Sequence, residues 1–340
     1  MQKNNPILIN VPHSSIFIPN EEMMYFTCPD IQNELAVMTD HFCDDLFDVN
    51  AEMIRFPVSR LVCDPERFRN DADEMMAKVG MGAVYALCSD GKKLKDIDDE
   101  HREWILNNYY DSYHRLLEEK VGTRLVEFGK CLIIDGHSFY DKPLPYEPDQ
   151  DSERPDICIG TDDYHTPGKL SDTVGWFFKR KGYSVGYNRP YAGSIVPLKY
   201  YQKDKRVSSV MIEINRRLYI DHDIKKTDGY MRIKTDISRL AEVLWRFLSC
   251  RHFYYVRTRS KEERSYLLEI LDNKGFCIEK GAGCFTVHDI LESCLPLTIN
   301  VASKEYGIMG NITCAAAAAS SKVLMECDEF LHHNVEKFMF

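Results

Sequence analysis

Two histidines, His13 and His137, each follow a short, mainly apolar run that is typical of a buried β-strand. Residues Ile7 to Val11 precede the first histidine, and residues Cys131 to Ile134 precede the second. Continuous apolar runs with β-branched side chains suit strands that are buried on both faces of a sheet. Ligands of open α/β sheets bind just beyond the carboxyl ends of such strands. We therefore expect the two imidazoles at one edge of a sheet, where they would be good ligands for zinc.

A carboxylate, Glu213, lies inside a third strand-like run, Val207 to Asn215. Burying a carboxylate between Ile212 and Ile214 costs free energy unless the group has a partner or a task. Beside a metal ion it would serve as a general base, taking a proton from water and returning it to a leaving amine. Glu213 is therefore the candidate catalytic residue.

Two arginines, Arg60 and Arg67, are candidates for binding the carboxylate of a substrate. A guanidinium group can hold both oxygens of a carboxylate at once. The alternative for each arginine is a structural ion pair with Asp64 that braces the sheet. The sequence leaves both interpretations open.

The segment from Asn188 to Ser194 has the composition of a loop that contacts a substrate. Asn188 opens it, Arg189 supplies a third guanidinium group, and Gly193 permits close approach of the backbone. Proline and glycine also make ordinary turns, so a plain turn is the alternative. The hydroxyl group of Ser138, directly after the second histidine, is a further candidate for substrate binding.

Five short motifs resemble the N-formylglutamate amidohydrolase family over about residues 6 to 225. They occur in the order and spacing of that family. The motifs are Val11-Pro-His-Ser-Ser15, Thr39-Asp40 with Asp44, Ser59-Arg60 with Asp64 and Arg67, Asp135-Gly-His-Ser138, and Glu213-Ile-Asn with Tyr219.

The resemblance implies that an aspartate, either Asp40 or Asp44, completes the metal site. The fold implied is similar to that of zinc carboxypeptidases, but Ile16 stands three residues after His13, where their His-x-x-Glu spacing has a glutamate. We expect both aspartates on one face of a helix from about Thr39 to Asn50, with the non-ligand behind the ligand. Alternatively, both are first-turn acids that complement the helix dipole.

The predicted fold class is α/β, with a mixed central sheet flanked by helices, as in hydrolases similar to zinc carboxypeptidases. Residues 1–250 are expected to form the catalytic domain and residues 251–340 a small α+β appendage. Self-association as a homo-oligomer, substrate access and regulation are equally compatible with the appendage. Further helices are expected at about Ile97 to Lys120, Pro167 to Lys181, Thr227 to Ser249 and Thr313 to Lys337.

Composition narrows the class of protein. A formal net charge of −10 without a basic stripe argues against nucleic-acid binding. No apolar stretch approaches the eighteen or so residues of a membrane span, and no secretory signal pattern precedes the first strand. Twelve cysteines without a Cys-x-x-Cys pair favour a reduced, cytoplasmic protein.

The predicted function is zinc-dependent hydrolysis of an N-formyl or N-acyl amino acid, with one divalent ion. The resemblance implies N-formyl-L-glutamate as the leading substrate, which is a small anionic molecule. Two alternatives remain open: a carboxypeptidase-like or amidase activity on a peptide or cell-wall fragment, and a binding protein that has kept the fold without catalysis.

Overall fold

The computed structural model describes residues 5–249, 253–273, 277–278, 297–300, 305–308 and 324–326. The chain divides into two compact units, Met1–Leu248 and Ser249–Phe340. Within the described residues, no helix has the length and apolar character needed to cross a membrane.

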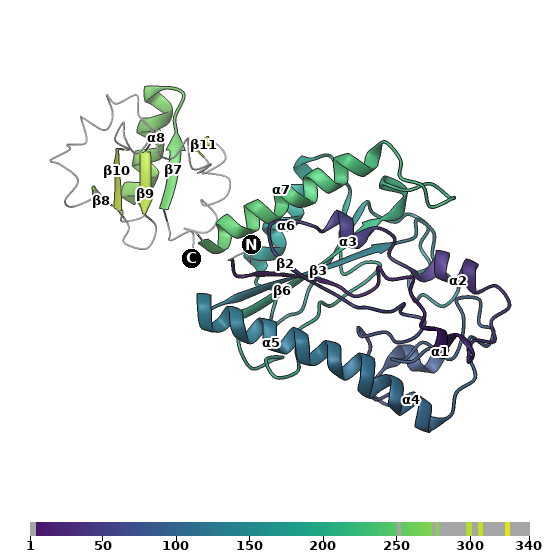
Figure 1. Ribbon diagram of the computed structural model, residues 1–340. Helices are drawn as coiled ribbons and strands as arrows, with labels where there is room; N and C mark the ends of the chain where they lie inside the picture. Colours follow the sequence, from purple (N-terminus) through teal and green to yellow (C-terminus); the bar gives the residue numbers. More distant parts are fainter. Residues whose placement is uncertain are drawn as a thin grey trace. The chain divides into compact units, whose positions relative to one another are not determined.

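A six-stranded mixed sheet forms the centre of the first unit (Figure 1). Its strands run in the order β2-β1-β3-β6-β4-β5 across the sheet. The first four strands in this order are parallel, whereas β4 is antiparallel to β6, and β5 is parallel to β4. The mixed α/β sheet expected from the sequence is therefore confirmed. The strands are β1 (Ile7–Val11), β2 (Glu52–Arg55), β3 (Cys131–Phe139), β4 (Ile157–Gly160), β5 (Val185–Tyr187) and β6 (Val207–Asn215).

Helices cover both faces of this sheet, because successive side chains of a strand point to opposite faces. Ile7 and Ile9 of β1 belong to the apolar core under α3 (Cys43–Leu46), α6 (Gly168–Arg180) and α7 (Gly229–Ser249). Leu8 belongs to the opposite core, under the long helix that lies across the sheet from α7 in Figure 1. That helix consists of α4 (Asp99–Ile105), a π-helical segment η2 (Leu106–Tyr110) and α5 (Asp111–Phe128).

The prediction of one helix from Thr39 to Asn50 is wrong. Thr39 instead ends an unpredicted helix, α2 (Ile31–Met38), and only the four residues of α3 are helical beyond it. Phe42 has a left-handed conformation with φ of 62°, which a continuous right-handed helix does not allow. Asp40 therefore lies in a turn between two helices.

The first unit also contains two short helices, α1 (Asn20–Met23) and the 3-10 helix η1 (Met75–Val79).

The described part of the second unit contains a five-stranded sheet in the order β11-β7-β9-β10-β8. Its elements are β7 (Phe253–Arg257), α8 (Lys261–Asn273), β8 (Cys277–Ile278), β9 (Leu297–Asn300), β10 (Glu305–Ile308) and β11 (Leu324–Glu326). The prediction of a helix from Thr313 to Lys337 is wrong at residues Leu324–Glu326, which form β11. The other residues of that predicted helix lie outside the described ranges. The α+β character is present in the described part.

Candidate active site

Polar side chains replace apolar ones toward the carboxyl ends of β1, β3 and β6, on the face covered by α5. His137 and Glu213 are register partners on the adjacent parallel strands β3 and β6. Asn10 and Asp135 are partners on β1 and β3 in the same way. The period of two carries all four side chains to one face, opposite the core residues of the other face. Strand β3 continues to Phe139, so His137 lies within the strand and not beyond its end.

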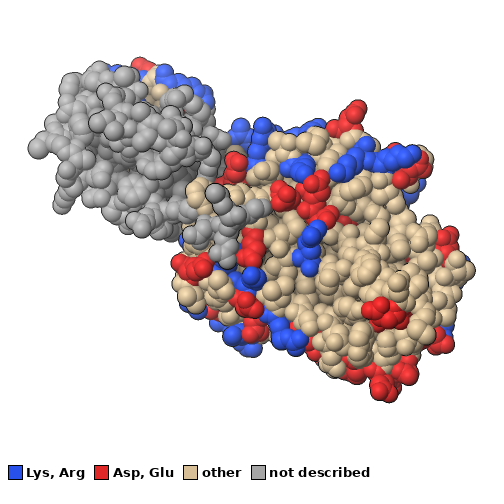
Figure 2. Space-filling view, viewed as in Figure 1, with Lys and Arg blue, Asp and Glu red and all other residues tan. Residues whose placement is uncertain are grey.

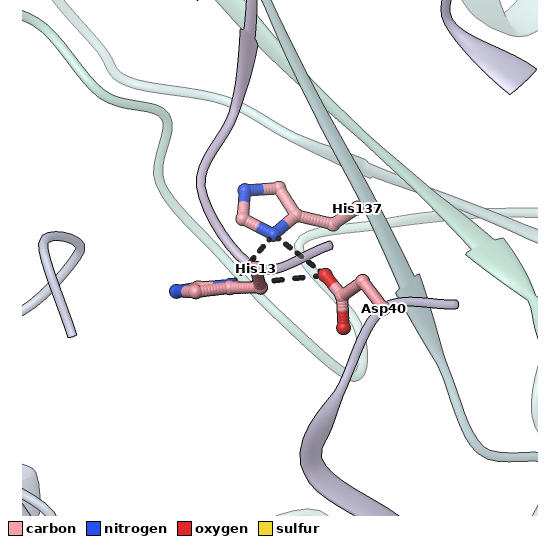
Figure 3. A group of neighbouring side chains, drawn as sticks. All are labelled: His13, Asp40 and His137. Carbon is pink, nitrogen blue, oxygen red and sulfur yellow. Dashed lines mark hydrogen bonds and ion pairs between the residues drawn. The ribbon is translucent and has the colours of Figure 1, made fainter. Parts of the chain in front are cut away.

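His13, Asp40 and His137 converge at this edge of the sheet (Figure 3). The Nδ1 atoms of the two histidines are 3.2 Å apart. Asp40 Oδ2 lies 3.2 Å from His137 Nδ1 and 3.7 Å from His13 Nδ1. All three side chains are buried. Three segments far apart in the chain therefore present three potential ligand atoms to one point.

The other ring nitrogen of each histidine contacts a buried carboxylate. His13 Nε2 is 2.8 Å from Asp64 Oδ1, and His137 Nε2 is 3.0 Å from Asp135 Oδ1. Burial would raise the pKa of both aspartates, but Arg60 beside Asp64 and His137 beside Asp135 hold each pKa below its usual value. An ionised carboxylate only accepts hydrogen bonds, so each Nε2 donates. The two Nδ1 atoms are thus left to face Asp40.

This arrangement fits a divalent cation such as zinc. Zinc–nitrogen and zinc–oxygen bonds of about 2.0–2.1 Å in tetrahedral geometry place neighbouring ligand atoms about 3.3 Å apart. The three observed separations scatter around that value. Histidines that donate their second nitrogen to a carboxylate are a regular feature of zinc sites. Without a cation or a proton between them, the facing Nδ1 lone pairs and the carboxylate would repel one another.

Two glutamates at the border of the cluster indicate an excess of negative charge. Burial raises the pKa of Glu213 to about 8, with Asp40 adding to this effect and His137 opposing it. Burial and the neighbouring Asp135 raise the pKa of Glu66 to about 8 as well. A divalent cation among these groups would stabilise their ionised forms.

One oxygen of the buried Glu213 side chain is unsatisfied, as is one oxygen of Glu22, a buried acid outside the cluster. The side chain is 7 % exposed, and Oε2 has no hydrogen-bond partner in the described structure. A buried unpaired oxygen is expensive, and such groups concentrate where a task compensates for the cost. The carboxylate can therefore accept a proton from a molecule that enters the site.

Asp44 does not reach this cluster, and the expectation that both aspartates lie near the metal is wrong. Its Oδ2 atom accepts a hydrogen bond from Arg55 Nη1 over 2.9 Å, on the surface. The reason is the turn at Phe42, because of which Asp40 and Asp44 do not lie on one face of a continuous helix. Ser138, in contrast, contributes its backbone N–H to Asp40 Oδ2 over 3.3 Å.

The arginines of the predicted site differ in how many of their donors are used. Arg60 donates from Nη2 to Asp64 Oδ2 over 2.7 Å and from Nε to the Tyr85 hydroxyl over 3.0 Å. Arg67 lies farther from the same aspartate, with Nε at 3.9 Å from Asp64 Oδ2. Its buried Nε atom has no hydrogen-bond partner among the described residues. Arg67 is therefore the better prepared of the two for a further anion.

Arg189 has its ion-pair partners outside the His13–Asp40–His137 cluster. It is half exposed and forms ion pairs with Asp149 and Asp151 of the segment between β3 and β4. Asn188 accepts a hydrogen bond from Thr161 N over 2.8 Å and donates one to Thr161 Oγ1 over 2.8 Å. These contacts brace the loop that contains both residues.

The far end of the same loop reaches the site. Gly193, with φ of +92°, adopts a conformation that side chains rarely allow, and its carbonyl oxygen packs against Gly160 of β4. Two residues later, Ile195 N donates to Asp135 Oδ2 over 3.2 Å. The loop thus supports the carboxylate behind His137 through its backbone.

Two residues near the cluster were not singled out from the sequence. Arg216 follows β6 directly and donates to Asp40 Oδ1 over 3.1 Å. Glu66 accepts from Asn10 Nδ2 over 2.9 Å and lies beside Asp135 and His137. The position of Arg216 directly after the strand of Glu213 was a usable signal, because it follows the same rule about strand ends.

Comparison with known proteins identifies the family of this chain. A protein of Pseudomonas aeruginosa named N-formylglutamate deformylase is 24 % identical over 228 residues, which cover 64 % of this chain and 82 % of that protein. A crystal structure of N-formylglutamate amidohydrolase from Ralstonia eutropha JMP134 has a similar fold, with a TM-score of 0.64 and 22 % identity, over 72 % of this chain and 94 % of that one. The family model of N-formylglutamate amidohydrolases matches residues 5–220, more than half of the chain. The chain therefore belongs to the N-formylglutamate amidohydrolase family, a family of amide-bond hydrolases.

Proposed function

We propose that this protein is a zinc-dependent amidohydrolase that cleaves N-formyl-L-glutamate, or a closely related N-acyl amino acid, into formate or another acid and the free amino acid. His13, Asp40 and His137 would hold one zinc ion. The observation that carries the proposal is the spacing of 3.2 to 3.7 Å among their three ligand atoms. The family relationship supports the substrate class, because both named relatives carry N-formylglutamate in their names.

Asp64 and Asp135 orient the two imidazoles so that each presents Nδ1 to the metal site. When bound there, a zinc ion would polarise the substrate carbonyl and lower the pKa of water from about 16 toward about 7. The carboxylate of Glu213 takes a proton from the attacking water through its unpaired Oε2 atom. It then delivers that proton to the departing nitrogen, because an amine leaves more readily than an amide anion.

Arg67 is the proposed recognition group for a carboxylate of the substrate. Its side chain is 23 % exposed and its Nε atom has no hydrogen-bond partner among the described residues, whereas Arg60 is 13 % exposed and donates to Asp64 and Tyr85. Arg60 instead keeps Asp64 ionised and in place behind His13. Arg189, Asn188 and Gly193 shape the neighbouring loop rather than contact the substrate.

The test is elemental analysis of the purified protein, followed by measurement of formate released from N-formyl-L-glutamate. We expect about one zinc ion per chain, loss of activity on dialysis against a chelator, and recovery when zinc is added back. Release of formate that continues unchanged in the metal-free protein would refute the metal-dependent mechanism. Absence of hydrolysis by the zinc-loaded protein, across a panel of N-acyl amino acids, would refute the proposed activity.

A further inference from the structure

Arg216 is buried next to the proposed metal ligands, and its guanidinium group donates to two segments that are far apart in the chain. It begins η3 (Arg216–Leu218), directly after β6, and is 7 % exposed. Nη1 donates to the carbonyl oxygen of Val37 over 2.7 Å, and Nε donates to Ser138 Oγ over 3.2 Å. Nη2 donates to Asp40 Oδ1 over 3.1 Å. The contacts with Val37 and Ser138 thus hold the guanidinium group in the position from which it binds Asp40.

These contacts divide the two oxygens of Asp40 between different partners. Oδ1 faces the guanidinium group, while Oδ2 faces His137 and receives the backbone N–H of Ser138 over 3.3 Å. Because Oδ1 is occupied by the guanidinium group, only Oδ2 is available on the side of the histidines.

We propose that Arg216 is a positioning residue that holds Asp40 as a one-oxygen metal ligand and so keeps a coordination position open. The inference rests on the proposed function, because it assigns a role toward the zinc ion of that site. A carboxylate free to rotate can bind a metal ion through both oxygens. Catalytic zinc sites need a position for water or substrate beside their three protein ligands. The planar fork of arginine fixes the plane of Asp40, which a single ammonium group cannot do equally well.

The neighbouring Arg217 provides a matched control. It is the same residue type at the next position, but its side chain is 42 % exposed and pairs with Asp156, away from Asp40. The test compares the wild-type protein with the variants Arg216→Met, Arg216→Lys and Arg217→Met. The zinc dissociation constant is measured by competition with a chromogenic chelator. The visible spectrum of the cobalt-substituted protein reports the coordination number, because four-coordinate Co²⁺ absorbs more strongly than five- or six-coordinate Co²⁺.

We expect Arg216→Met to raise the zinc Kd by about 10–100-fold, the usual effect of removing a partner of a metal ligand. Arg216→Lys should raise it less, since the charge remains while the fork is lost. Both should weaken the cobalt bands, because the second oxygen of Asp40 can then bind. Arg217→Met should leave the Kd and the spectrum as in the wild type.

A folded Arg216→Met protein with wild-type zinc affinity and an unchanged cobalt spectrum would overturn the inference. If that variant does not fold, Arg216→Lys decides by the same two measurements. A wild-type protein that binds no zinc would instead refute the proposed function, so the two failures are distinguishable.

Discussion

Replacement of Glu213 by glutamine separates proton transfer from metal binding at this site. The amide has the shape of the carboxyl group but cannot accept a proton. General-base assistance is typically worth about 10²–10⁴-fold in rate, which corresponds to about 2.7–5.5 kcal/mol of barrier at 1.36 kcal/mol per tenfold. We therefore expect kcat for N-formyl-L-glutamate to fall by about that factor. Zinc content should remain at the wild-type level, because Glu213 is not among the three converging ligand atoms.

The structure also predicts the effect of this change on stability. Glu213 Oε2 is buried without a partner, so the wild-type carboxyl group already bears a desolvation cost on the order of 1–3 kcal/mol. Its pKa is raised by burial from 4.5 to about 8 in the metal-free folded protein. The folded protein then binds more protons than the unfolded chain, so its stability falls as the pH rises between these two values. Glutamine removes this fall, and the metal-free variant at pH 8 should unfold at the same or a higher temperature than the wild type.

Glu34 supplies the control for a buried glutamate outside the site. It is 3 % exposed and accepts hydrogen bonds from Ser89 N over 2.7 Å and Ser89 Oγ over 2.8 Å. Glu34→Gln should lower the unfolding temperature, because the amide cannot accept both bonds, while leaving kcat nearly unchanged. The assays are formate release, elemental analysis and thermal unfolding of both variants. If Glu213→Gln keeps wild-type kcat, the general-base assignment is wrong; if it loses zinc, Glu213 is a metal ligand.

Three further predictions concern Arg67, His137 and Lys95. Arg67→Ala should cost about 2–5 kcal/mol of binding for acidic substrates, seen as a raised KM, whereas Arg189→Ala should leave KM unchanged; equal effects would contradict the assignment. His137→Ala should abolish zinc binding in a folded protein. His165→Ala removes the hydrogen bond of Nδ1 with Val207 O and the bond that Gln202 N donates to Nε2, so it should reduce stability but retain zinc. Burial lowers the pKa of Lys95 from 10.5 to about 7, so the unfolded chain binds more protons between those values and stability should rise with pH there. Urea unfolding at pH 7 and pH 9 should show a gain on the order of a few kcal/mol that Lys95→Met lacks, and an equal gain in both proteins would refute it.

Local sequence patterns were sufficient for the strands that carry the site. The runs at Ile7–Val11 and Val207–Asn215 coincide with β1 and β6, because segments rich in β-branched and aliphatic residues are typical of buried strands. The same reasoning identified His13, His137 and Glu213 as candidate site residues. Polar residues next to or within such runs are costly to bury unless they have a partner or a function. The resemblance to the family rested on the same segments, and the match over residues 5–220 confirms it.

Which aspartate, Asp40 or Asp44, lies near the two histidines depends on a backbone conformation that cannot be predicted from the sequence. Phe42, with φ of 62°, stops the helix that would have placed both acids on one face. Aromatic residues seldom adopt this conformation, so no local rule predicts it. Packing of the surrounding chain decides the matter, and it leaves Asp44 paired with Arg55 at the surface.

Which arginine is available for a substrate carboxylate likewise depends on the tertiary structure. On sequence alone, Arg60 and Arg67 are equivalent candidates to pair with Asp64, and no partner for Arg189 is evident; each has five donors. Their availability depends on which carboxylates lie within reach: Asp64 for the first, and Asp149 with Asp151 for the last. Side-chain types determine what chemistry this chain can perform. Only the fold determines which charges are already neutralised and which remain free for a ligand. Asp64 is near both Arg60 and Arg67 in the sequence, but the tertiary structure decides which guanidinium group it binds more closely, and it alone brings Asp149 and Asp151 to Arg189.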